Sequence, residues 1–260
     1  MKSKTTNQGK NEERKLEYQE KWDLEKTLKF LIKKADPVIF DVGANNGSSI
    51  NDFKSWWPKS HIHCFEPQEE CLRDLVDTAS IYEKSGSIKI NTFAVGNVPS
   101  KNAVFYTHDI NSGVSGFNKI NLDSNDSINI QKLSSQGDDK KKLYSDTLNH
   151  DRLVEIVRLD DYINSIDSNL HIDFLKIDTQ GFEPEVLDGL GKKLANVDVL
   201  MTELMLFDFY DRSLSFSDIE RYLLRHKFSM YDISHISKNP MNGRTDWLDV
   251  IYVNDRLLSK

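Results

Sequence analysis

Short apolar runs alternate with longer segments of helical periodicity from residue 38 onward, and this alternation restricts the fold more than any other feature of the chain. We expect buried strands over residues 38–40, 61–65, 88–95, 172–177 and 197–204. Amphipathic helices are expected over residues 48–57, 68–79, 183–190 and 217–226. Strands that are separated by helices form parallel βαβ units. The pattern therefore predicts an α/β protein with a doubly wound, mostly parallel sheet.

Two further apolar segments, residues 228–233 and 247–253, lie near the end of the chain. The residues between them leave no room for a helical crossover, and parallel neighbours need one. We therefore predict an antiparallel hairpin at one edge of the sheet.

The first 36 residues differ in character from the rest. Residues 1–10 have a disordered composition, and residues 11–35 have a highly charged helical pattern that Pro37 ends. Its apolar stripe consists of Leu24, Leu28, Leu31 and Ile32. We expect a flexible tail and a charged helix over residues 1–36 and one domain over residues 37–255. The helix is expected to pack on that domain or on a partner subunit in a homo-oligomer.

Residues 108–152 interrupt the alternation with a polar insertion rich in Ser, Asn, Asp and Lys. Long loops without secondary structure are usually functional or disordered. Two interpretations stay open: a flap over the active-site edge of the sheet, or a disordered insertion.

The net charge of -7 and the absence of a basic stripe argue against nucleic acid as a partner. No apolar run approaches the roughly 18 residues of a membrane span, and the first residues lack the apolar core of a signal peptide. We expect a soluble, cytoplasmic protein. His61 and His63 share one face of a strand with no further histidine or cysteine near enough to complete a metal site, so no metal is predicted.

Acidic residues stand at the carboxyl ends of four expected strands: Asp41, Glu66, Asp178 and Glu203. One acid at a strand end is commonly a helix cap or a turn residue. Four of them along one edge, where open parallel sheets bind their ligands, instead indicate a binding site.

The loop after the first strand, "DVGANNGSS", has Gly43 and Gly47 but Asn45 where a dinucleotide-binding loop has its middle glycine. Asp41 adds negative charge where a pyrophosphate needs none. A cationic nucleoside without phosphate, S-adenosylmethionine, fits better, with Glu66 placed to accept both ribose hydroxyls. The two glycines are expected to let the backbone approach the methionine part of that cofactor. A nicotinamide-dependent dehydrogenase and a cofactor-binding scaffold without activity are the alternatives.

With these residues in hand, the chain resembles the FkbM family of S-adenosylmethionine-dependent methyltransferases over roughly residues 37–254. The segments that carry the resemblance are "VIFDVGANNGSS", "CFEPQEECLRDL", "INTFAVGN", "IDFLKIDTQGFEPEVLDGL" and "VLMTEL". The resemblance implies a Rossmann-like methyltransferase that acts on hydroxyl oxygens of sugars, glycans or secondary metabolites. The acceptor is then a small molecule or a glycan. The cofactor-binding residues on these motifs are Asp41, Gly43, Ala44, Asn45, Gly47, Glu66, Pro67, Ala94 and Asp178.

Transfer to an alcohol requires that a base remove the hydroxyl proton. The catalytic candidates are Asp178 and Glu203, with Asp178 favoured by its place in the motif, although it can equally bind cofactor or hold the turn that follows. His108 and His150 flank the insertion and are further candidates. Glu183 is expected to be structural because it opens a helix. The apolar residues after the fifth strand form either an acceptor pocket or core: Met205, Phe207, Phe209 and Tyr210.

Overall fold

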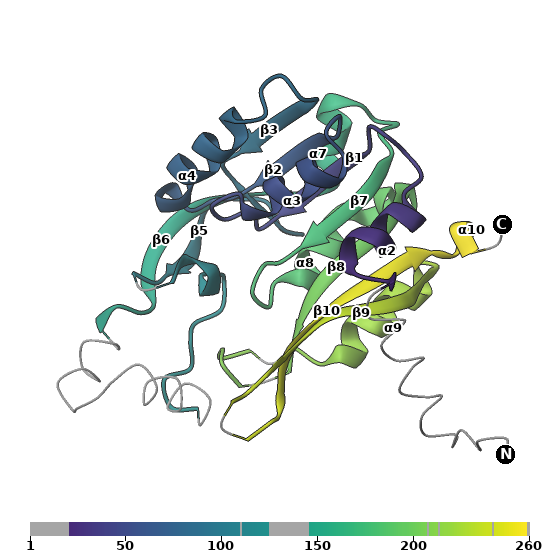
Figure 1. Cartoon of the computed structure of the whole chain (residues 1–260). Coiled ribbons are helices and arrows are strands. Elements are labelled where there is room, and N and C mark those ends of the chain that lie inside the picture. The colour runs from purple at the N-terminus through teal and green to yellow at the C-terminus, as the bar shows by residue number, and fades with distance from the viewer. Residues whose placement is uncertain are drawn as a thin grey trace, which may run out of the picture.

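A seven-stranded sheet forms the centre of the computed structural model, with the strand order β3-β2-β1-β7-β8-β10-β9 (Figure 1). The structure describes residues 21–109, 111–124, 146–206, 208–212, 214–240 and 242–258. The parallel strands are β1 (Val38–Val42), β2 (His61–Phe65), β3 (Ser87–Asn91), β7 (Ile172–Ile177) and β8 (Val197–Met205). β10 (Thr245–Asn254) runs antiparallel to β8 and to the edge strand β9 (Phe228–Lys238).

Helices cover both faces of this sheet, so the strands are apolar on both sides. One face carries α2 (Leu24–Leu31), α3 (Ser48–Trp56) and α4 (Glu69–Ser80), which pack on strand residues such as Ile39 and Phe174. The other face carries α7 (Leu159–Ile166), α8 (Glu183–Leu190) and α9 (Phe216–Arg225), which pack on Phe40 and Leu175. The predicted doubly wound, mostly parallel sheet with an antiparallel edge hairpin is confirmed.

A second, three-stranded sheet lies beside α4 and was not predicted (Figure 1). The expected strand over residues 88–95 is in fact two strands. β3 ends at Asn91, whose amide donates to the Cys64 carbonyl oxygen at 2.9 Å, and β4 (Ala94–Val95) pairs with β6 (His150–Val157) instead. β5 (Ser100–Thr107) pairs antiparallel with β6. The error has a physical reason, because β4 finds its partner more than fifty residues further along the chain, where local periodicity carries no information.

The order in which the chain adds strands to the sheet reverses between the parallel strands β1 and β7, and the carboxyl ends of these two strands are in contact. The Asp178 N–H donates to the Val42 carbonyl oxygen at 2.9 Å. Gly43 has φ +86°, and a Cβ atom there would lie 1.9 Å from the Asp178 carbonyl oxygen. At Gly47, with φ +81°, a Cβ atom would lie 2.9 Å from the Leu75 side chain. Protein atoms fill the space that a side chain would take at each position, which is a reason for glycine in addition to the expected approach to a cofactor.

Of the expected N-terminal extension, residues 1–20 lie outside the described part of the chain, and with them the expectation of a flexible tail. Asp23 caps α2 by accepting the Lys26 N–H at 2.8 Å, and Leu28 and Ile32 bury the apolar stripe against α3 and the sheet. The short remaining elements are the 3-10 helices η1 (Ser112–Val114) and η2 (Gly191–Asn196) and the C-terminal α10 (Asp255–Leu258). No helix within the described ranges combines the length and the apolar character needed to cross a bilayer.

If α2 is part of the folded domain, truncating its buried side chain should destabilise the whole protein. Leu28 is 0% exposed, so we expect Leu28→Ala to lower the free energy of unfolding by about 2–5 kcal/mol. Phe30→Ala is the matched control, because Phe30 is 49% exposed on the same helix, and it should cost about 1 kcal/mol or less. Urea unfolding of both variants measures the difference, and equal losses would contradict the docking of α2 through Leu28.

Candidate functional site

A cavity of about 350 Å³ opens at the carboxyl ends of β1, β2 and β7, where the order of the strands reverses. Such a switch point is where open α/β sheets bind their ligands. Three of its walls come from the loops after β1, β2 and β7, and a fourth comes from the segment 111–117. Its main lining residues are Gly43, Asn45, Glu66, Pro67, Gln68, Ala94, Phe105, Ser112, Ser115, Phe117, Asp178 and Phe182.

Glu66 follows β2 directly and is 2% exposed, with its carboxylate on the cavity wall. Its Oε2 accepts the Asn45 N–H and its Oε1 accepts the Gln68 N–H, each at 2.8 Å. Burial raises the pKa of Glu66, and the two backbone donors oppose that rise. Because a carboxylate has about four acceptor positions, lone pairs remain for a ligand.

Asp41 lies inside β1, is 0% exposed and does not line the cavity. Its Oδ2 accepts the Ser49 hydroxyl, and its Oδ1 is 3.7 Å from the Lys176 ammonium. Burial raises the pKa of Asp41, while Lys176 and Ser49 counteract the rise. The carboxylate thus acts from behind the loop, where it orients Ser49 and Lys176.

Asp178 follows β7, lines the cavity and keeps a side-chain exposure of 35%. Its Oδ2 accepts from the Lys176 ammonium at 3.1 Å, and its Oδ1 accepts from the Gln180 amide at 3.0 Å. Burial alone would lower the pKa of Lys176, but the carboxylates of Asp178, Asp41 and Glu203 raise it above its ordinary value. Lys176 therefore stays charged and holds Asp178 in place.

Gln180 connects Asp178 to Glu203, which lies within β8 and does not reach the cavity. The Gln180 amide nitrogen donates to Glu203 Oε2 at 2.7 Å as well as to Asp178. The Tyr210 hydroxyl donates to the Gln180 amide oxygen at 2.8 Å, which fixes the orientation of the amide. Burial, and next the charge of Asp178, raise the pKa of Glu203 well above its ordinary value.

Glu183 holds the turn between β7 and α8. Its Oε1 accepts the Thr179 N–H at 3.0 Å, the Thr179 hydroxyl at 3.1 Å and the Gly181 N–H at 3.2 Å. Burial raises the pKa of Glu183 to about 7. These contacts match the structural role expected for it, because they fix the backbone that presents Asp178 and Gln180.

The described part of the insertion, residues 111–124 and 146–152, lies against the site. Ile120 and Leu148 pack on Phe209 and Tyr210, which are 3% and 4% exposed, so these described residues form core. Phe207 and residues 125–145 lie outside the described residues. The His108 Nδ1 accepts the Asn149 N–H, and the His150 Nε2 is 3.3 Å from Asp109; neither histidine lines the cavity.

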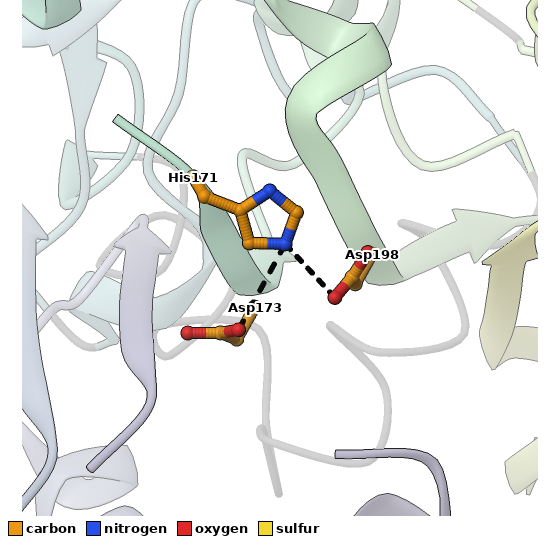
Figure 2. A group of neighbouring side chains, drawn as sticks. All are labelled: His171, Asp173 and Asp198. Atoms are coloured by element: carbon orange, nitrogen blue, oxygen red, sulfur yellow. Dashed lines mark hydrogen bonds and ion pairs between the residues drawn. The ribbon is translucent and has the colours of Figure 1, made fainter. Parts of the chain in front are cut away.

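One group of possible metal ligands lies at the opposite edge of the sheet, where His171 points its Nε2 between Asp173 and Asp198 (Figure 2). Both carboxylates already have cationic partners. Asp173 accepts from the Lys34 ammonium at 2.9 Å, and Asp198 accepts from the Arg256 guanidinium at 3.1 Å. These contacts form an ion-pair network that joins α10 and the segment directly after α2 to the sheet. Of the histidines considered in the sequence, His63 Nδ1 bonds the Tyr162 hydroxyl at 2.7 Å.

The predicted cofactor residues separate into two groups in the structure. Those that line the cavity are Gly43, Asn45, Glu66, Pro67, Ala94 and Asp178, whereas Asp41, Ala44 and Gly47 are not among its lining residues. Sequence reasoning did not single out Phe105 as a lining residue. For residues 108–152 it left open a flap over the active-site edge or a disordered insertion, because polar composition does not distinguish the two; residues 111–117 line the cavity.

Comparisons with known proteins point to one family. The model of the methyltransferase FkbM domain matches residues 41–230. The chain is 28% identical over 192 residues to the 2-O-methyltransferase NoeI of Sinorhizobium fredii, covering 71% of this chain and 70% of NoeI. It is 25% identical over 155 residues to Methyltransferase 1 of Beauveria bassiana, covering 60% of this chain and 59% of that relative's length. A solved structure of magnesium protoporphyrin IX methyltransferase from Synechocystis PCC 6803 matches with a TM-score of 0.47 and 9% identity, over 97% of this chain and 86% of the other.

The raised pKa of Glu183 predicts a pH-dependent stability. Its pKa is about 7 in the folded protein and 4.5 as the ordinary value, so the folded state holds an extra proton between these values. Protonated Glu183 therefore stabilises the folded protein. This stabilisation is fully present below pH 4.5 and is lost as the pH rises through about 7. Glu183→Gln cannot ionise, so we expect its stability to fall less over this window, by up to roughly 3 kcal/mol.

Urea unfolding of both proteins across that pH window measures the two slopes. Glu69→Gln, at the exposed start of α4, is the control and should keep the slope of the unchanged protein. Parallel curves for Glu183→Gln and the unchanged protein would contradict the assignment.

Proposed function

The chain belongs to the FkbM methyltransferase family, whose methyl donor is S-adenosylmethionine, and from that premise we propose that it methylates a hydroxyl oxygen of a sugar, a glycan or a secondary metabolite. The observation that carries this proposal is the Asp178 carboxylate, which lines the cavity, remains partly exposed and has both oxygens held by hydrogen bonds. An alcohol needs such a group, since its proton must leave as the new bond forms.

The cavity supports one placement of the cofactor. Glu66 accepts the ribose hydroxyls with the lone pairs that the Asn45 and Gln68 N–H groups leave unused. Pro67 and Ala94 border the adenine, and the loop at Gly43 and Asn45 borders the methionine part. Asp41, Ala44 and Gly47 do not line the cavity, and their role is to hold that loop in its conformation. This placement brings the sulfonium toward Asp178, whose negative charge favours a cation.

The reaction is a direct displacement. The acceptor oxygen attacks the methyl carbon, the carbon–sulfur bond breaks, the sulfur keeps the electron pair, and Asp178 takes the hydroxyl proton. Holding oxygen, methyl and sulfur in line can contribute about 7–11 kcal/mol, and the base a further 100- to 10,000-fold in rate, roughly. Glu203 serves less well as the base, because it does not line the cavity, Gln180 bonds it from the cavity side, and burial raises its pKa.

The name of one relative supports an oxygen acceptor. NoeI is named a 2-O-methyltransferase, and the chain matches it over 192 residues. A fold does not determine which acceptor an enzyme methylates, so the proposal rests on Asp178 and on this relative. The family match sets aside a nicotinamide-dependent activity. A panel of p-nitrophenyl glycosides, incubated with methyl-labelled S-adenosylmethionine, tests it directly. Labelled methyl ethers are expected, and transfer to amines alone would contradict the proposal.

Removing the proposed ribose acceptor should weaken cofactor binding. We expect Glu66→Ala to raise the Kd for S-adenosylhomocysteine by about tenfold or more, because hydrogen bonds to a charged group contribute about 1.5–3 kcal/mol. Glu70→Ala, an exposed residue of the neighbouring α4, is the control and should bind as the unchanged protein does. Titration calorimetry decides, and an unaltered Kd for Glu66→Ala would remove Glu66 from the site.

The variant Asp178→Asn distinguishes two roles of Asp178, that of the general base and that of a residue that binds the cofactor. The amide keeps the shape of the carboxylate but accepts no proton, so we expect kcat on a glycoside substrate to fall about 100-fold or more. The Kd for S-adenosylhomocysteine should change by about threefold at most. The opposite pattern, a large loss of cofactor affinity with little loss of kcat, would assign Asp178 to cofactor binding and require another base.

A further inference from the structure

The segment 111–117, part of the insertion, crosses the cavity and is fastened at Ser112. The Ser112 hydroxyl donates to the Asn45 side-chain oxygen at 3.1 Å, and the Ser112 carbonyl oxygen accepts from the Gln68 side-chain amide at 3.3 Å. Asn45 belongs to the loop after β1 and Gln68 to the loop after β2. Ser112 therefore joins the two loops that carry the best-matched cofactor motifs.

The same two residues hold Glu66. The Asn45 N–H and the Gln68 N–H donate to the two oxygens of the Glu66 carboxylate, each at 2.8 Å. Asn45 has φ +46°, an uncommon conformation for a residue other than glycine, and its side-chain bond to Ser112 helps to hold it there. Glu66, Asn45, Ser112 and Gln68 thus form a closed ring of hydrogen bonds, in which Ser112 braces the two donors of Glu66.

The far end of the segment is fastened to the opposite wall. The Val114 carbonyl oxygen also lies 2.8 Å from the Tyr210 hydroxyl, whose one proton it shares with the Gln180 amide oxygen, and the Asn118 amide donates to the Gln180 carbonyl oxygen at 3.2 Å. A Cβ atom on Gly116 would lie 3.3 Å from the Gln180 side chain, so the segment packs closely on the turn after Asp178. The segment is consequently a built wall of the cavity, held on both sides.

Ser115 lies in this wall and has an unused hydroxyl. The residue is 6% exposed and lines the cavity, whereas its Oγ is itself buried and has no hydrogen-bond partner among the residues that the structure describes. A buried hydroxyl without a partner destabilises the conformation in which it occurs. Rotation of this side chain toward the cavity would let a polar group of a ligand supply the partner.

We propose that residues 111–117 belong to the cofactor site, in which Ser112 positions Glu66 and Ser115 donates or accepts a hydrogen bond to S-adenosylmethionine. The inference rests on the cofactor placement proposed above. A cavity of about 350 Å³ lies at the lower end of the range for one drug-sized ligand, so a residue that lines it faces the cofactor. This resolves the role of part of the polar insertion: its first residues complete the binding site.

We expect Ser115→Ala to have two effects: the unliganded protein keeps or gains thermal stability, and the affinity for the cofactor falls. Removal of an unsatisfied buried hydroxyl should leave the Tm of the unliganded protein equal or higher, whereas a serine that is merely structural would lower it. The Kd for S-adenosylhomocysteine should rise about three- to tenfold, the effect of one lost neutral hydrogen bond. Ser165→Ala is the control, because Ser165 bonds the Tyr162 carbonyl oxygen on α7; its Kd should not change.

Ser112→Ala tests the positioning of Glu66 through a ratio that a general loss of stability does not alter. The unchanged protein is expected to prefer S-adenosylhomocysteine over its 2′-deoxyribose analogue. This preference should fall about threefold or more in Ser112→Ala, because Glu66 is no longer braced toward the ribose, and should stay unchanged in Ser165→Ala.

An unchanged Kd in Ser115→Ala together with an unchanged ribose preference in Ser112→Ala overturns the inference. So does a slower methyl transfer by Ser115→Ala at unaltered cofactor affinity, which would make Ser115 an acceptor contact. Failure of the placement itself has a separate signature, because Glu66→Ala would then bind S-adenosylhomocysteine normally. Failure to methylate any hydroxyl affects neither binding measurement.

Discussion

The contact of Lys176 with two carboxylates is the interaction on which the rest of the site depends. Its ammonium lies 3.7 Å from Asp41 and 3.1 Å from Asp178, at the junction of β1 and β7. Asp41 is 0% exposed, and a buried charge without a partner is strongly unfavourable. One buried cation therefore allows Asp41 and Asp178 to lie side by side on neighbouring strands, and of these groups Asp178 lines the cavity.

The four acids of the sheet edge have different tasks because their surroundings differ. Asp41 stabilises the loop from behind, and Glu66 faces the cavity with two backbone donors attached. Burial raises the pKa of Glu203 and favours its neutral form, whereas Asp178 is partly exposed and braced by Lys176 and Gln180. Glu66 and Asp178 both line the cavity with a fixed orientation, but Asp178 is the more exposed of the two, and a base needs access as well as orientation.

The hydrophobic alternation predicted the central sheet well, since its strands and helices are locally encoded; the helix expected over residues 183–190 has those bounds in the structure. The local hydrophobic pattern did not predict strands whose pairing partners are far away in the sequence. β4, β5 and β6 form a second sheet across a long insertion, and Tyr210, considered for an acceptor pocket, is core that orients Gln180. A second reason for Gly43 was also out of reach of local patterns, because the atom that excludes a side chain there belongs to Asp178, far away in sequence.

The sequence by itself determined the class of fold, the family motifs and the set of acids at the strand ends, because each depends on residues close together in the chain. Only the tertiary structure decided which acid is reachable. The deciding partners come from other elements: Lys176 of β7 contacts Asp41 of β1, and Gln180 bonds Glu203 of β8. The closure of the cavity by Ser112 and Ser115 was decided in the same way, since hydrogen bonds across the whole domain hold that wall in place.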